Sequence, residues 1–62
     1  MMRVIINHNS DNGIESFTYE NVISIKPSDT NPNRVEITHI IDGTEFIDKV
    51  RLDEESELII KK

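Results

Sequence analysis

The chain of 62 residues has 12 Asp and Glu against 7 Lys and Arg, which gives a formal net charge of −5 at pH 7. This length predicts a single domain over residues 1–62 with a small core, because a domain of this size buries only about 60% of the surface of its unfolded chain. The absence of Cys excludes disulfides and thiolate chemistry, and the acidic balance argues against a general nucleic-acid binder.

Residue composition favours β-structure. The chain has no Ala, the best helix former, and eleven Ile, which favour strands. Abundant Ile, Asn and Lys are also typical of an AT-rich genome, so we expect a low-GC bacterium or its phage as the source. No apolar run is long enough to span a bilayer and no signal peptide is evident, so we expect a cytoplasmic protein that makes no membrane contact.

The first half of the chain predicts two strands joined by a tight turn. Residues 2–8 (MRVIINH) and 14–19 (IESFTY) are rich in β-branched and aromatic residues. Asn12-Gly13 between them is typical of a type I′ hairpin turn. Residues 22–26 (VISIK) predict a third strand, or a continuation of the second strand past a bulge.

Residues 26–33 (KPSDTNPN) are predicted to be an irregular connection between two hairpin-like halves. Pro27 and Pro32 argue against a central strand there, and the Ser, Asp and Asn residues suit turns.

Residues 34–52 are predicted to form a hairpin closed on Asp42-Gly43, since both residues can adopt the positive φ of a type I′ turn. A two-residue loop gives these pairs on one face: Val35 with Val50, Ile37 with Asp48, His39 with Phe46, and Ile41 with Thr44. It gives these pairs on the other face: Arg34 with Arg51, Glu36 with Lys49, Thr38 with Ile47, and Ile40 with Glu45. A one-residue slip would turn a whole strand over, so the apolar pattern selects this register.

Three residues do not fit this hairpin pattern. Asp48 lies on the apolar face, and Ile40 and Ile47 lie on the polar face. Either a bulge or a second face that is partly buried would explain them.

The chain then predicts a turn at residues 53–57, or one helical turn with Asp53 as N-cap. Residues 58–61 (LIIK) predict a short strand at the edge of the sheet, where Lys61 and Lys62 would discourage further pairing.

The two halves also resemble each other. Arg3-Val4-Ile5-Ile6-Asn7-His8 shares Arg, Val, Ile and His with Arg34-Val35-Glu36-Ile37-Thr38-His39, and each segment leads to a Gly turn and a Phe. A two-residue loop at Asn12-Gly13 would set His8 opposite Phe17, as His39 is opposite Phe46. Either the chain consists of two similar ββ units with pseudo-two-fold symmetry, or two short hairpins share common residue types by chance.

Together these elements predict an all-β fold of five or six short antiparallel strands, a meander that closes toward a compact barrel or sandwich. The predicted core consists of Val4, Ile6, Phe17, Val22, Ile25, Val35, Ile37, Ile41, Phe46, Val50, Leu52 and Ile59.

No catalytic, metal or cofactor motif is present. His8 and His39 could form a metal or proton site with Asp48 or Asp11, but they lack ligand spacing, and stacking on a neighbouring Phe is the preferred interpretation. Residues 7–13 fail the calcium-loop pattern. There is no Gly-rich phosphate loop and no Ser in a G-x-S-x-G context, so we predict a protein that is not an enzyme and needs no cofactor.

The predicted function is a protein–protein interaction module whose partner is another protein or a second copy of the chain, with self-association preferred and a homodimer as one form. The predicted partner-binding residues are Ile40, Ile47, Glu45, Arg51, Glu54 and Glu55. The alternative is an acidic inhibitor from a phage or mobile element that occupies a basic nucleic-acid-binding groove, and its expected negative surface is formed by Glu45, Asp53, Glu54, Glu55 and Glu57. A third hypothesis, a barrel that stacks nucleic-acid bases, depends on Phe17, Tyr19 and Phe46.

Overall fold

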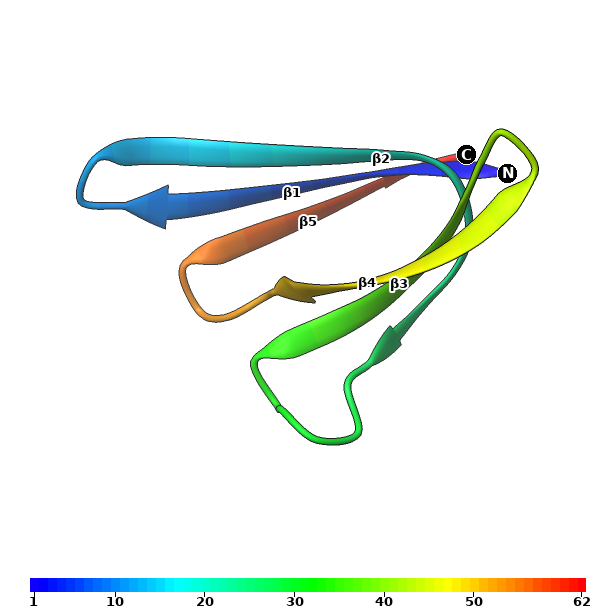
Figure 1. Cartoon of the computed structure of the whole chain (residues 1–62). Coiled ribbons are helices and arrows are strands. Elements are labelled where there is room, and N and C mark those ends of the chain that lie inside the picture. Colours follow the sequence, from blue (N-terminus) through cyan, green and yellow to red (C-terminus); the bar gives the residue numbers. More distant parts are fainter.

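The computed structural model describes residues 1–62 and contains five β-strands and no helix (Figure 1). The strands are β1 (Met2–Ser10), β2 (Gly13–Pro27), β3 (Arg34–Ile41), β4 (Thr44–Arg51) and β5 (Ser56–Lys61). Nothing in the chain forms a helix that could cross a membrane.

All pairings are antiparallel, and the strands form one sheet in the order β4-β3-β2-β1-β5. The prediction of an all-β antiparallel fold is therefore confirmed. Strands β1 to β4 form the expected meander, but β5 returns to pair with β1. Strands β4 and β5 are consequently the two edges of an open sheet, so the closed barrel is not confirmed, and no two-fold repeat of similar units is shown.

Strand β2 bends and folds the sheet over itself (Figure 1). Its first part pairs with β1 and its second part pairs with β3, and both registers shift near Val22. Asn21, next to these irregularities, has a φ of 53°. The extra residue of a bulge kinks a strand. The first part of β2, with β1 and β5, therefore lies over the second part of β2, with β3 and β4. Residues 22–26 thus continue the second strand past a bulge.

The predicted connection begins later than expected, because Pro27 is the last residue of β2. Pro27 pairs with Val35 of β3, and β1 does not extend to this part of β2. Ser28 donates its backbone N–H to the carbonyl of Arg34, so the alternation of the ladder turns the nitrogen of Pro27 away from β3. The missing N–H of proline therefore costs no ladder hydrogen bond.

The core lies between the two parts of the folded sheet. Five hydrophobic side chains are buried there: Val4, Ile6, Val22, Ile37 and Val50. Six partly buried side chains pack against them: Met2, Tyr19, Ile25, Val35, Leu52 and Leu58. The five buried residues were all predicted to be in the core, and a small core is what the length of the chain implies.

Four predicted core residues are not part of this core. Phe17, Ile41 and Phe46 are exposed. The two Phe residues share the inner face of the sheet with core residues, but they remain 43% and 45% exposed. Ile59 is half-buried outside the core, because the register of β5 on β1 places Leu58 on the core side instead.

The two hairpins close differently. All eight predicted pairs of the β3–β4 hairpin are confirmed, and Asp42 and Gly43 have φ values of 51° and 79°, as a type I′ turn requires. In the β1–β2 hairpin the loop is Asp11-Asn12, and neither residue has a positive φ. The predicted Asn12-Gly13 loop is wrong, and His8 lies opposite Glu15 instead of Phe17.

Candidate functional site

The predicted partner-binding residues fall into two groups. Ile40, Glu45 and Ile47 lie on the outer face of the β3–β4 hairpin, where Ile40 is opposite Glu45 and Ile47 is opposite Thr38. Ile40 and Ile47 are therefore diagonal neighbours on one face, within reach of each other. Ile47 is 60% exposed and Ile40 is half-buried.

The second group lies at the other end of β4. Arg51 is six positions from Glu45, about 20 Å along an extended strand. Glu54 and Glu55 follow in the turn between β4 and β5, and both are exposed. The structure therefore does not bring Arg51, Glu54 and Glu55 together with the isoleucines.

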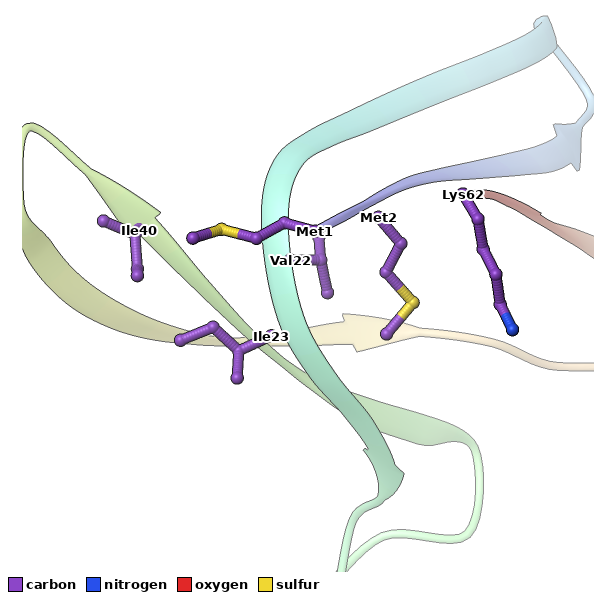
Figure 2. A pocket seen from close by; sticks show the side chains of 6 residues that line it. All are labelled: Met1, Met2, Val22, Ile23, Ile40 and Lys62. Atoms are coloured by element: carbon purple, nitrogen blue, oxygen red, sulfur yellow. The ribbon is translucent and has the colours of Figure 1, made fainter.

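An open apolar groove of about 660 Å³ lies where β2 bends (Figure 2). Its lining residues are Met1, Met2, Val22, Ile23, Ile40 and Lys62. Lys62 is the only polar residue among them, and Figure 2 shows the Met1 side chain extending from the N-terminus toward Ile40. The groove exists because the bulge in β2 buries Val22 and leaves its neighbour Ile23 47% exposed.

This groove continues into the exposed outer face of the hairpin. Ile23 and Ile40 both line the groove, and Ile47 is the diagonal neighbour of Ile40. We call these three residues, on β2, β3 and β4, the outer apolar stripe. The sequence indicated Ile40 and Ile47 because they interrupt a polar face, whereas Ile23 was missed because its exposure depends on the bend.

His39 and Asp48 form a contact between β3 and β4 on the inner face. His39 Nε2 lies 2.7 Å from Asp48 Oδ2, and His39 is buried. Since a carboxylate only accepts, the imidazole N–H donates. This contact explains the presence of Asp48 on the apolar face.

Aromatic rings surround the same histidine. The Tyr19 ring contacts it edge-on at 5.2 Å between centroids, and the Phe46 ring lies tilted at 6.1 Å. Burial, and secondarily the negative charge of Asp48, raise the pKa of the Tyr19 hydroxyl. Of the predicted stacking aromatics, Tyr19 is therefore engaged with His39, while Phe17 and Phe46 are exposed.

His8 is the second buried histidine, and it holds the turn before β5. Its Nδ1 lies 3.1 Å from Ser56 Oγ, and the Ser56 hydroxyl donates to Asp53 Oδ1 at 3.1 Å. Of the two alternatives predicted for residues 53–57, the turn forms and the helical turn does not, and Asp53 caps this turn by accepting the backbone N–H of Glu55. Burial alone would raise the pKa of Asp53, but hydrogen bonds from Arg51, Glu55 and Ser56 hold it below its usual value.

This arrangement differs from that of a nucleophilic triad. In a Ser–His–Asp triad the imidazole lies between the hydroxyl and the carboxylate. Here the Ser56 hydroxyl lies between His8 and Asp53 and donates a hydrogen bond to the carboxylate, so His8 Nδ1 is not placed to accept the hydroxyl hydrogen. The two histidines belong to separate clusters, and no group of three or more His, Cys, Asp and Glu side chains could hold a metal ion.

The acidic residues do not form one surface. Glu45 lies at the start of β4, far from the turn that holds Glu54 and Glu55. The Asp53 carboxylate is paired with Arg51 and is largely covered. The continuous negative surface predicted for an acidic inhibitor is therefore interrupted.

No protein-family model, curated protein or solved structure matches this chain.

Proposed function

We propose that this chain is a non-catalytic protein–protein interaction module that binds other copies of itself through the outer apolar stripe of Ile23, Ile40 and Ile47. The main support for this proposal is that eight large hydrophobic side chains are exposed while only five hydrophobic side chains are buried. Single exposed hydrophobic residues are ordinary, but a connected apolar surface beside an apolar groove is typical of a protein-binding site.

The surface area of the chain supports the same proposal. A compact monomer of 7.2 kDa exposes about 4100 Å², whereas this chain exposes 4551 Å². Its radius of gyration is 11.7 Å, compared with about 10.6 Å for a compact domain of this length. A fold with excess surface, a small core and no disulfide gains stability when a second copy covers part of it.

The test compares two exposed isoleucines on different hairpins. Ile47→Glu places a charge in the stripe, and we expect it to weaken self-association about tenfold or more, because burying an isoleucine is worth about 1.5–3 kcal/mol. Ile14→Glu is the matched control, since Ile14 is 71% exposed and lies at the start of β2, outside the stripe. Sedimentation velocity over a range of concentrations measures both.

Two results would contradict this proposal. A wild-type chain that stays monomeric at high concentration would contradict self-association. Equal effects of the two substitutions on self-association would show that the stripe is not part of the interface. The acidic-inhibitor alternative has less support, because Glu45 is remote from Glu54 and Glu55 and because Asp53 is paired with Arg51.

A further inference from the structure

Strand β4 has one edge without a neighbouring strand, and the hydrogen-bond pattern shows which residues face it. Leu52 donates its backbone N–H to the carbonyl of Asn33 at 2.8 Å. Hydrogen-bonded and non-hydrogen-bonded pairs alternate in an antiparallel ladder, so the even-numbered residues of β4 bond to β3. The backbone N–H and C=O groups that point to the open edge are those of Glu45, Ile47, Lys49 and Arg51.

The side chains of these residues form a pattern that is complementary to itself. Glu45, Ile47 and Lys49 alternate along the outer face, and all three are exposed. Lys49 has no carboxylate within 4.0 Å, since the ion pairs of the chain involve other cations. A strand that reads acidic–apolar–basic matches an antiparallel copy of itself about its central residue.

We propose that β4 pairs with β4 of a second copy, antiparallel and with Ile47 on the two-fold axis, so that Glu45 of each copy faces Lys49 of the other. This proposal rests on the self-association proposed above and specifies that two copies meet at Ile47, the residue of the stripe that lies on an edge strand. Ile47 then contacts Ile47 of the second copy, and the backbone groups of the open edge bond across the axis. The two sheets join into one, and the outer apolar stripes of the two copies become continuous.

Other registers match less well. A shift of two residues toward Arg51 pairs Glu45 with Arg51 but sets Ile47 against Lys49. The opposite shift sets Ile47 against Glu45. A shift of one residue places backbone groups that already bond to β3 opposite the free ones. Only the register centred on Ile47 satisfies the backbone, the apolar contact and the charges together.

A cavity lies beside one end of this edge. A cavity of about 260 Å³ separates the Lys49–Arg51 end of β4 from Phe17 and Tyr19 on β2. No strand of the chain pairs with this edge of β4. On the inner face, a paired strand would also cover Phe46, one of the exposed aromatic side chains.

The other edge strand carries the same spacing, Glu57-x-Ile59-x-Lys61. Its central residue gains less from pairing, because Ile59 is already half-buried opposite Ile5 of β1, whereas Ile47 is 60% exposed. Glu57 is also engaged by the side-chain amide of Asn7. These differences favour β4 as the interface.

The test is a pair of complementary charge variants at low ionic strength, where ion pairs are least screened. We expect Glu45→Lys and Lys49→Glu each to weaken the dimer about tenfold, because like charges then face each other at two symmetric positions. Mixing the two variants in equal amounts restores wild-type affinity, since one edge presents two lysines and the other presents two glutamates. Sedimentation velocity measures association, and circular dichroism confirms that each variant is folded.

Glu57→Lys is the matched control, because it makes the same charge change in the same spacing on the other edge, and we expect it to leave the dimer intact. The proposal is overturned if the single variants dimerise as tightly as wild type, if the mixture does not recover, or if only Glu57→Lys dissociates the dimer. In each of these cases wild-type dimerisation would still support the proposed function. A monomeric wild type would overturn both.

Discussion

The β1–β2 and β3–β4 hairpins are built from similar residues, yet their turns place glycine differently. In β3–β4, Gly43 is the second loop residue, after Asp42, and both have positive φ. In β1–β2, Gly13 follows the Asp11-Asn12 loop and has a φ of 114°. The second arrangement matches a turn followed by a glycine bulge rather than a type I′ turn. A shift of the glycine by one position relative to the loop therefore changes the register of the hairpin, and with it every cross-strand pair.

The same difference determines which residue lies opposite each histidine. His39 lies opposite Phe46, as the type I′ register requires, whereas His8 lies opposite Glu15. His39 also contacts Asp48 and the rings of Tyr19 and Phe46, whereas His8 contacts Ser56. Hairpins of similar composition can thus place equivalent residues in different environments.

The largest effect is expected where the two hairpins share the core. Ile6 and Ile37 are both completely buried, one in each hairpin. We expect Ile6→Ala and Ile37→Ala each to lower the free energy of unfolding by about 2–5 kcal/mol, a large part of the total stability of about 3–9 kcal/mol expected for this length. Urea unfolding followed by circular dichroism, at one protein concentration, measures the change.

The exposed aromatic residues are the controls for this prediction. Phe17→Ala and Phe46→Ala should each cost about 1 kcal/mol, because much of each ring already contacts water. Costs equal to those of the isoleucines would show that the two parts of the sheet close more tightly around these rings than the structure indicates.

A smaller effect is expected at the two glycines. An added Cβ would meet no atom within 4 Å at Gly13 or Gly43, so the cost of alanine is conformational at both positions. Gly43, at φ 79°, is close to the left-handed region that other residues can enter, and Gly43→Ala should cost about 1 kcal/mol. Gly13, at φ 114°, is farther from that region, and Gly13→Ala should cost about 2 kcal/mol.

Thermal unfolding of both variants, with Gly43→Asn as control, measures this difference. Asparagine tolerates the left-handed region better than alanine, so Gly43→Asn should be the mildest change. If Gly43→Ala were the more costly alanine substitution, the assignment of the two turns would be wrong.

The smallest effect is expected at the contact between the hairpins, where Tyr19 of β2 meets His39 of β3. Tyr19 is the only tyrosine, so the ultraviolet absorbance of phenolate reports its ionisation alone. We expect its pKa to lie above the ordinary value of 10.0. Asp48→Asn should lower the pKa only partly, because burial is the larger cause and the charge of Asp48 the smaller.

The sign of the linked stability follows from this raised pKa. The folded chain holds the Tyr19 proton more tightly than the unfolded chain, so this contribution is complete below pH 10 and is lost as pH rises through the folded pKa. Tyr19→Phe should remove this alkaline loss. A Tyr19 that titrates at its ordinary value would contradict burial of its hydroxyl.

Contacts between residues close along the chain are the ones that the sequence predicts best. The Asp42-Gly43 turn and the alternation around it predicted all eight pairs of the β3–β4 hairpin. The same alternation placed Ile40 and Ile47 on the outer face, where the proposed site lies. The prediction was wrong at Asn12-Gly13, because that dipeptide fits two turn types, and the neighbouring residues did not distinguish between them.

The sequence by itself determined the strand content, the second hairpin and most of the core, because alternation and turn chemistry act between residues that are close along the chain. Only the tertiary structure decided the bend of β2 at Asn21, the return of β5 to β1 and the exposure of Phe17 and Phe46. These features depend on which surface the distant half of the sheet covers, and that cover also determines which residues remain open to a partner. No local sequence pattern predicts this cover, because the residues of the two parts that meet lie far apart along the chain.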